Sequence, residues 1–323
     1  MREDQVIVVT GTGFCTALGA EPASAIQRGE SAVMEQDELH RLPHRKVARV
    51  GKVDLRPWLK RRKDRKLMAR PAQLALAAAG PALSAWSGET DNLGLYLGVG
   101  REPGDDGESE PALVAAQVEG KLDEDAVAGR CRDLYPPLLP LKTLPNMALA
   151  HISIHLDIRG ENGAWSGGSV AGLTALRAGI WSIREGRSPA ALVVAADSWV
   201  SIGAVRDRLR IAHGRPIRSP GEAGVALLIE SLASARARGA SVLAVVDTDR
   251  KDAAGLSPDG HFDALGQCQA ADALLALALQ IGSDPRHVWI EDAETEQPSV
   301  GVRIEVSSGN AWYSPASEGD LNG

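Results

Sequence analysis

The sequence predicts an α/β protein in which helices are layered on mixed β-sheets. Patterns typical of buried strands alternate with helical patterns along the chain, and turn-rich β segments are almost absent. With 323 residues the chain is long enough to bury a sizeable core. Its formal net charge of -7 argues against nucleic acid or an anionic membrane surface as a partner.

The chain opens with an apolar run, residues 6–9, that predicts a buried strand ending at a glycine-rich turn. Gly11 and Gly13 in that turn resemble part of a dinucleotide-binding fingerprint. Thr16 stands where the third glycine is needed, and no acidic residue closes a second strand about 20 residues further on. We therefore interpret the glycines as a plain strand-to-helix turn.

A basic run at residues 60–66 precedes a helix of small residues expected at 73–79. We interpret the run as a solvated helix end, with docking of an acidic partner as the alternative. Residues 92–100 then predict a second buried strand, and residues 144–165 predict a helix followed by a strand.

The second half of the chain continues the alternation, starting with a helix that begins at residue 170 and ends at Gly186. Its apolar residues recur at helical spacing: Leu173, Leu176, Ile180 and Ile183. The segments that follow are a strand at 191–199 buried on both faces, a strand–helix–strand unit at 224–246, a helix at 271–282 and a strand at 287–293.

A turn of small residues, Gly167-Gly168-Ser169, leads into the helix at residue 170. An α/β enzyme can place a nucleophile there, because the helix N-terminus stabilises negative charge and its N–H groups can hold an oxyanion. A serine hydroxyl still needs a base before it attacks. The alternative is an N-cap serine, which is the commonest use of serine at a helix start. From the residues alone we favour the cap.

The spacing of the histidines does not identify any one of them as the base that a nucleophilic Ser169 needs. The chain contains His40, His44, His151, His155, His213, His261 and His287. His151 and His155 are four residues apart, as metal ligands on a helix are, but Ile152 stands where a zinc protease has its glutamate. We interpret this pair as packing residues, and we place His213 and His261 in polar loops.

The three cysteines, Cys15, Cys131 and Cys268, are far apart and form no CxxC pair. They predict neither a zinc site nor a disulfide framework, so we expect no metal and no cofactor. No signal-peptide pattern precedes the first strand, and no apolar run is long enough to span a membrane. A cytoplasmic protein is the resulting expectation.

Several segments, in order, resemble one family over roughly Val6 to Pro298. They are VVTGTGFCTALG, DRKLMARPAQLALAAAGPAL, LPNMALAHISIHLDIRGENGAW and GEAGVALLIESLASARARGA. They resemble the β-ketoacyl-acyl-carrier-protein synthases of fatty acid and polyketide assembly. The resemblance implies a thiolase-like layered α-β-α fold with a complete first half, residues 1–230, and a partial second half, residues 231–306. Residues 307–323 are expected to form a flexible tail.

The resemblance also locates the family's catalytic positions. Ser169 stands in place of the cysteine nucleophile, and Ala293 in place of the histidine that opens a His-Gly-Thr-Gly-Thr-Pro loop. Glu294 replaces the following glycine, whereas Thr295 and Pro298 are retained. The chain stops before the family's second histidine. These departures imply an active site without a thiolate or imidazoles, which decarboxylative condensation needs.

Three functions follow from this resemblance. The first is a non-condensing subunit, similar to a chain-length factor, that forms a heterodimer with an active ketosynthase and works with acyl carrier protein; a homodimer is the alternative assembly. The second is a serine-dependent acyltransferase that uses Ser169 on acyl-carrier-protein or coenzyme A thioesters. The third is a degenerate homologue that binds acyl chains or regulates its neighbours. Whether the chain is an enzyme stays open at this point.

Overall fold

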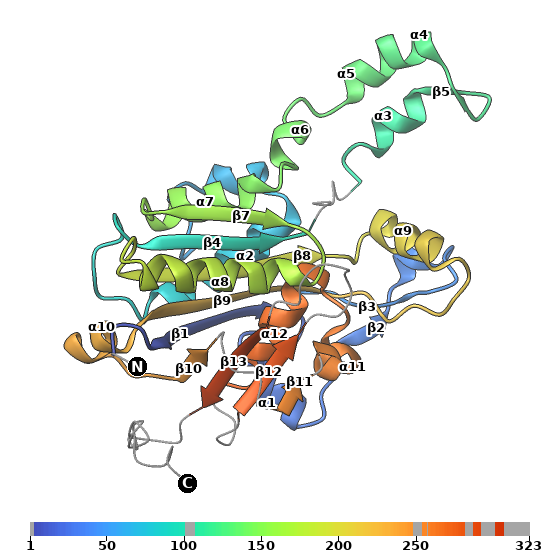
Figure 1. Ribbon diagram of the computed structural model, residues 1–323. Coiled ribbons are helices and arrows are strands. Elements are labelled where there is room, and N and C mark those ends of the chain that lie inside the picture. The colour runs from blue at the N-terminus through green and yellow to red at the C-terminus, as the bar shows by residue number, and fades with distance from the viewer. Residues whose placement is uncertain are drawn as a thin grey trace.

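The computed structural model describes residues 3–100, 107–247, 254–256, 258–281, 287–291 and 301–306. A nine-stranded sheet runs through it in the order β11-β12-β13-β10-β1-β9-β8-β4-β7 (Figure 1). Its strands are β1 (Ile7–Thr16), β4 (Gly94–Val99), β7 (Asn162–Ser166), β8 (Ala190–Ser198), β9 (Glu222–Ser231), β10 (Ala244–Asp247), β11 (Ala254–Leu256), β12 (His287–Glu291) and β13 (Gly301–Val306). Two short hairpins add β2 (Val33–Glu35) with β3 (Lys46–Ala48), and β5 (Gln117–Val118) with β6 (Lys121–Leu122).

The helices vary widely in length. The α-helices are α1 (Pro22–Gln27), α2 (Arg70–Leu83), α3 (Glu110–Ala115), α4 (Glu124–Ala126), α5 (Arg132–Leu134), α6 (Leu139–Lys142), α7 (Asn146–Leu156), α8 (Val170–Arg184), α9 (Ile202–Ala212), α10 (Leu232–Ala237), α11 (Phe262–Leu265) and α12 (Asp272–Ala278). Tighter turns form η1 (Asp37–Leu39), η2 (Arg62–Leu67), η4 (Pro258–His261) and η5 (Gln269–Ala271), and a wider π-turn forms η3 (Val127–Cys131).

The sheet repeats one strand order on either side of its centre. From the middle outward, one side reads β1-β9-β8-β4-β7 and the other reads β10-β13-β12-β11. The pairings also match: β1–β9 and β10–β13 are antiparallel, whereas β4–β8 and β11–β12 are parallel. Within the described residues β7 has no counterpart in the second half. The expected thiolase-like layered fold is therefore confirmed.

Helices cover both faces of the sheet. On one face α8 packs with α12, its counterpart in the second half, and on the other face α2 packs with α7 (Figure 1). Side chains of β8 divide between the two layers by strict alternation: Val193 belongs to the α8 layer, whereas Leu192 and Val194 belong to the α2 layer. Every residue of β8 is buried, as expected for a strand covered on both faces.

The first strand differs from its prediction, because β1 continues to Thr16 and does not end before the glycines. A side chain at Gly13 would collide with the carbonyl oxygen of Ala78 in α2, and one at Gly11 with that of Ala82. Both glycines therefore serve close strand–helix packing. The prediction of a turn at Gly11 and Gly13 was wrong, because glycine in a strand also marks a close approach of another backbone.

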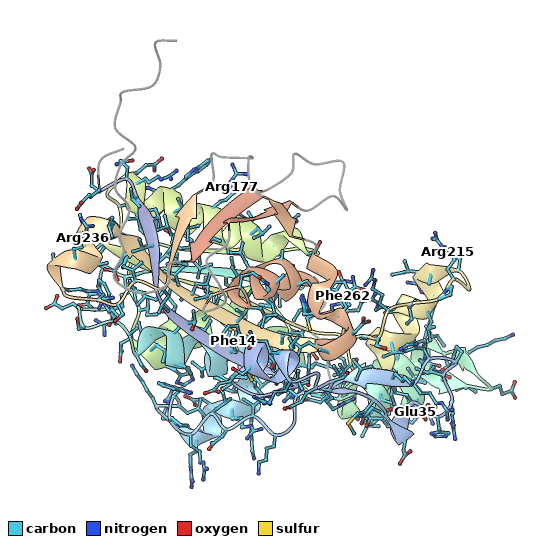
Figure 2. The ribbon with its side chains drawn as sticks, turned by 90° about the horizontal axis from the view of Figure 1, so that it is seen from below. Phe14, Glu35, Arg177, Arg215, Arg236 and Phe262 are labelled. Carbon is cyan, nitrogen blue, oxygen red and sulfur yellow. The ribbon has the colours of Figure 1, made fainter. Side chains whose placement is uncertain are left out.

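Most of the other expected elements are present, including the helix and strand at 144–165, the helix at 170–186 and the strands at 92–100 and 191–199. The helix expected at 73–79 is longer and spans Arg70–Leu83. Figure 2 shows Arg236, Arg215 and Glu35 at the periphery of the molecule, whereas Phe14 of β1 lies toward its interior. The expected tail, residues 307–323, lies outside the described residues.

Residues 107–144 form an arm that projects from the layered body and carries α3 to α6 (Figure 1). Many of its apolar side chains are exposed: Leu113, Val114, Val118, Leu122, Val127, Leu134, Tyr135, Leu138, Leu141 and Leu144. Isolated exposed apolar residues are normal on a protein surface, but such a concentration on one projection is typical of an interaction surface.

Candidate functional site

The carboxyl ends of the parallel strands β4, β7 and β8 meet at one edge of the sheet. The turn Gly167-Gly168-Ser169 follows β7 there, and the N–H of Gly167 donates to the carbonyl of Val99 at the end of β4, at 3.0 Å. The Ser166 hydroxyl donates to the carbonyl of Gly100, at 3.1 Å. Ligands of α/β proteins bind at this end of the strands, so the turn occupies a suitable place for a site.

Ser169 is the N-cap residue of α8, as expected, but its side chain makes no capping hydrogen bond. The preference for a serine that caps by its hydroxyl was therefore wrong. Its backbone, with φ of -55° and ψ of -29°, lies in the ordinary right-handed region. Ser169 itself thus carries none of the backbone strain that functional sites often store.

The second half of the chain contributes the other wall of this region. A Cβ on Gly172, in the first turn of α8, would come within 2.9 Å of the Ala270 carbonyl oxygen and 3.1 Å of the Leu274 Cβ. The N-terminal ends of α8 and α12 are therefore in direct contact. Nothing in the sequence pattern indicated that these residues, about a hundred positions apart, would meet.

Asp197, at the end of β8, joins the two halves. It accepts hydrogen bonds from the indole of Trp199 at 2.9 Å and from the N–H of Ala270 at 3.3 Å. Burial raises the pKa of Asp197 to about 7, although these hydrogen bonds oppose the shift. A side chain at Gly100 would collide with its carboxylate, so Asp197 lies directly beneath the strand ends.

Beside Asp197 lies a second buried acid, Asp272. It accepts a hydrogen bond from the N–H of Cys268 at 2.7 Å, and the Nε2 of His261 lies 3.1 Å from the same oxygen. Burial raises the pKa of Asp272, against the opposing contact with His261. The placement of His261 in a polar loop was wrong, because its ring is enclosed between this acid and Phe262.

Cys268 is fully buried, and burial raises the pKa of its thiol well above the ordinary value. The thiol is therefore held in its protonated form, which is a poor nucleophile and a poor metal ligand. Cys15 is similar, because burial raises its pKa to about 11. Neither cysteine therefore offers a thiolate at neutral pH.

The histidine pair on α7 lies elsewhere. His151 and His155 are buried, and their rings stack with centroids 5.9 Å apart. The Nε2 of His151 lies 3.2 Å from the Leu67 carbonyl, and the N–H of Lys60 donates to the Nδ1 of His155 at 3.3 Å. Burial lowers the pKa of both rings. Their interpretation as packing residues is confirmed.

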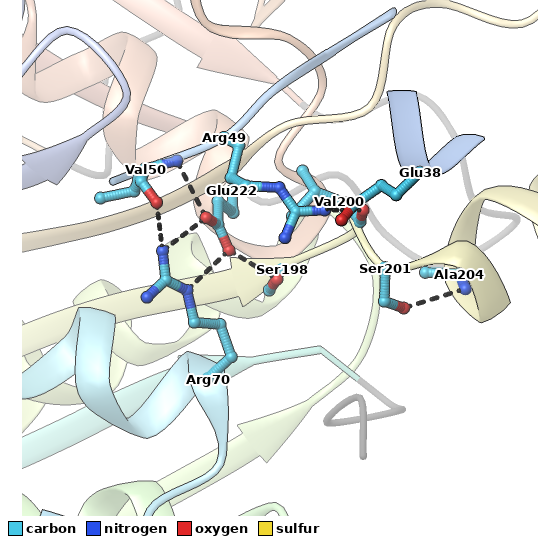
Figure 3. Close-up of polar contacts among 9 residues, drawn as sticks. All are labelled: Glu38, Arg49, Val50, Arg70, Ser198, Val200, Ser201, Ala204 and Glu222. Atoms are coloured by element: carbon cyan, nitrogen blue, oxygen red, sulfur yellow. Dashed lines mark hydrogen bonds and ion pairs between the residues drawn. The ribbon is translucent and has the colours of Figure 1, made fainter. Parts of the chain in front are cut away.

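A cavity of about 800 Å³ opens beside the end of β8, between residues 49–52, the start of α9 and the base of the arm. Its floor is the fully buried carboxylate of Glu222, which Arg70 contacts at 2.7 and 3.0 Å (Figure 3). The N–H of Val50 and the Ser198 hydroxyl donate to the same carboxylate, at 2.9 and 2.8 Å. No motif in the sequence predicted this cavity.

The comparisons with known proteins agree with this architecture. Residues 4–216 match the family described as Beta-ketoacyl synthase, N-terminal domain. The chain belongs to the beta-ketoacyl synthase family. A relative, 3-oxoacyl-[acyl-carrier-protein] synthase 2 of Staphylococcus aureus strain N315, is 24% identical over 342 residues, covering 95% of this chain and 77% of the relative.

Solved structures of ketosynthases share its fold. The ishigamide ketosynthase/chain length factor has a TM-score of 0.73 at 17% identity and covers 94% of this chain and 99% of its own. A beta-ketoacyl synthase from Burkholderia phymatum STM815 has a TM-score of 0.70 at 15% identity, with 94% and 100% covered. A type II PKS acyl-carrier protein in complex with its ketosynthase has a TM-score of 0.69 at 14% identity, with 94% and 99% covered.

This ketosynthase-like chain is thus a member of a family that serves fatty acid and polyketide synthesis, as the sequence resemblance indicated. Ala293 lies outside the described residues, so its relation to the turn at Ser169 rests on the sequence alone. In the part of the chain that the structure describes, no helix has both the length and the apolar character needed to cross a membrane.

Proposed function

We propose that this protein is a non-condensing partner subunit of an active ketosynthase, similar to a chain-length factor. The observation that carries the proposal is the arm, whose exposed apolar residues include Leu122, 73% exposed, and Leu138, 53% exposed. Covering such a surface with a partner removes apolar area from water. A ketosynthase/chain length factor is among the solved structures that share its fold, which supports this choice.

The edge strand β7 offers a second surface for the partner. No described strand pairs with its outer side, and alternate residues Asn162, Ala164 and Ser166 are exposed. An uncovered strand edge is a template for pairing with another chain. A partner that covers both the arm and this edge supplies hydrogen-bond partners to the backbone of β7. The same partner buries the exposed apolar side chains of the arm.

The site chemistry supports a subunit that does not condense. We assign Ser169 to the position of the family's cysteine and Ala293 to that of its histidine. A serine hydroxyl ionises several pH units above a cysteine thiol, whose ordinary pKa is about 8.5, and an alanine offers no imidazole for acid–base work. The unstrained backbone of Ser169 is also consistent with a turn that no longer has to present a nucleophile.

The heterodimer can be tested with the ketosynthase encoded beside this chain, co-expressed and analysed by light scattering after size exclusion. We expect a one-to-one complex that Leu138→Asp with Leu141→Asp weakens at least tenfold, because two charges would be buried at the interface. Ile211→Asp is the control, since Ile211 is 61% exposed near the carboxyl end of α9, outside the arm. A folded chain that never associates, or a homodimer that excludes the synthase, would contradict the proposal.

Acyl carrier protein is the further partner we propose, docked on the basic run. In the described chain Arg62, Lys63 and Lys66 are exposed and have no ion-pair partner, whereas Arg61 pairs with Asp64. We expect Arg62→Glu with Lys63→Glu to weaken carrier-protein binding and to reduce its salt dependence. Equal binding by that double variant would exclude this surface.

A serine acyltransferase is the second candidate, favoured by one observation: the Ser169 side chain does not cap α8. Incubation with acyl-loaded carrier protein, followed by intact mass measurement, separates the two functions. An acyl adduct on the wild type that Ser169→Ala removes would establish the transferase. No adduct on a folded protein is the result expected for the partner subunit.

A further inference from the structure

Two buried histidines lie beside the base of the arm. His151 and His155 of α7 are 5% and 6% exposed, and their rings stack 4° from parallel with centroids 5.9 Å apart. They line a cavity of about 170 Å³ together with Leu138 and with Leu141 of α6. Its other apolar lining comes from Leu67, Met147 and Ile154. The histidine pair and the base of the arm therefore share one small and mainly apolar space.

The hydrogen bonds of the pair hold both rings in the neutral form. The Nδ1 of His155 accepts from the N–H of Lys60 at 3.3 Å, so the ring proton is on Nε2. A second proton would go to Nδ1 and break this hydrogen bond. Among the described residues Nε2 has no hydrogen-bond partner, because Asp64 Oδ2 is 3.9 Å away and Arg61 donates to that oxygen at 3.1 Å.

The charged groups around the cavity are mostly positive. Asp64 is the one acid among the described lining residues, whereas Arg61 and Lys142 are cations that also line the cavity. Lys60 adds positive charge beside His155. The turn η2 carries the further cations Arg62, Lys63, Arg65 and Lys66. The single buried carboxylate is thus outnumbered before either histidine takes up a proton.

The other elements packed against α7 offer no compensating acid. They are α2, β4 and β7. Neither of these strands contains a charged residue, and Arg70, the one charged residue of α2, is paired with Glu222. Asp157, which follows α7, is exposed and pairs with Lys60. Two imidazolium ions side by side in this space would therefore repel each other and lack partners.

The titration of the pair has a definite direction. Burial lowers the pKa of both histidines, and the neighbouring His151 lowers the pKa of His155 further, against the opposing charge of Asp64. In the unfolded chain a histidine titrates near pH 6.5. The stabilisation from the neutral pair is therefore present above about pH 6.5 and is lost as the pH falls through the lower folded values.

We propose that His151 and His155 form an acid-sensitive switch for the arm, in which protonation admits water to the cavity and displaces α6 from α7. The helix α6 is the wall that moves, because Leu138 and Leu141 are 53% and 50% exposed. The helix α7 is held in place by Ala148 and Ile152, which belong to the buried core with α2 and β4. The inference concerns this chain alone and does not depend on a ketosynthase partner.

Hydrogen–deuterium exchange of the whole chain, followed by mass spectrometry from pH 5 to 7.5, tests the switch. After correction for the intrinsic pH dependence, we expect residues 138–156 to exchange at least about tenfold faster at pH 5, since lowering one histidine pKa by one unit is worth a factor of ten. The double variant His151→Gln with His155→Gln should lose this dependence. His40→Gln with His213→Gln is the matched control, because both histidines are exposed and lie outside α7.

Two single variants test the electrostatics in opposite directions. Asp64→Asn removes the negative charge and should move the midpoint of the change to lower pH, whereas Lys60→Gln removes a positive charge and should move it higher. Exchange of residues 138–156 that does not depend on pH would overturn the proposal, as would a dependence that the histidine double variant retains. Equal acceleration in α8 would also overturn it, because the whole protein would then be unfolding in acid.

Discussion

The carboxylate of Asp197 lies in the core, where two backbone N–H groups and the indole of Trp199 donate to it. Burial still outweighs these hydrogen bonds and raises the pKa of Asp197 to about 7; the nearby Asp272 carboxylate raises it further. In the unfolded chain the same group titrates near pH 4. Between these values the folded protein holds a proton that the unfolded chain releases.

This difference makes stability depend on pH. Because the folded pKa is the higher one, the stabilisation is fully present below about pH 4 and is lost as the pH rises through about 7. We expect Asp197→Asn to flatten the fall in the free energy of unfolding between pH 5 and 8, measured by urea titration. Asp54→Asn is the control, since hydrogen bonding to Arg56 lowers the pKa of Asp54 to about 2. An unchanged slope in Asp197→Asn would contradict the assignment.

At the residue scale the sequence located only part of the site. Ser169 was identifiable, because small residues before a helix mark a turn. Asp197, Cys268 and Asp272 were missed, because Asp197 ends an apolar strand and the other two lie some seventy residues later. Only the packing of α12 against α8 brings them together, and no local pattern encodes that contact.

At the scale of elements, the glycines of β1 show that glycine in a sequence is compatible with either a turn or a strand packed closely against a helix. Glycine is frequent in turns, but Gly11 and Gly13 lie in a strand that presses against α2. Periodicity located α8 and β8 well, because each has a long apolar pattern. The end of β1 was misplaced because its sequence does not reveal which backbone will approach it.

Gly13→Ala should therefore destabilise the protein strongly. Its new Cβ would overlap the Ala78 carbonyl, and neither backbone can move without separating β1 from α2. We expect a loss of about 3 kcal/mol in the free energy of unfolding. Gly129→Ala, where a Cβ meets nothing within 4 Å, should change stability little. Equal stability of the two variants would show that β1 and α2 are less closely packed than described.

On the scale of the whole molecule, the two halves share one sheet and one helical layer. β1 and β10 pair at the centre, and α8 and α12 enter the same apolar cluster with both sets of strands. A boundary near residue 230 thus divides the sequence but not the core, because this apolar cluster contains residues from both sides of the boundary. Because β7 has no counterpart in the described second half, the sheet is asymmetric about its central pair, β1 and β10.

Gly172 lies where the two halves touch, so Gly172→Val tests whether they unfold together. Even one added carbon would come within about 3 Å of Ala270 and Leu274 in the second half. We expect calorimetry to show one transition in wild type and one, at lower temperature, in the variant, since overpacking costs about 1–3 kcal/mol. Gly168→Val, where a Cβ meets nothing within 4 Å, should melt close to wild type. The contrary result is two calorimetric transitions, with Gly172→Val lowering the temperature of only one of them. It would mean that each half is stable separately and that the shared helical layer does not couple their unfolding.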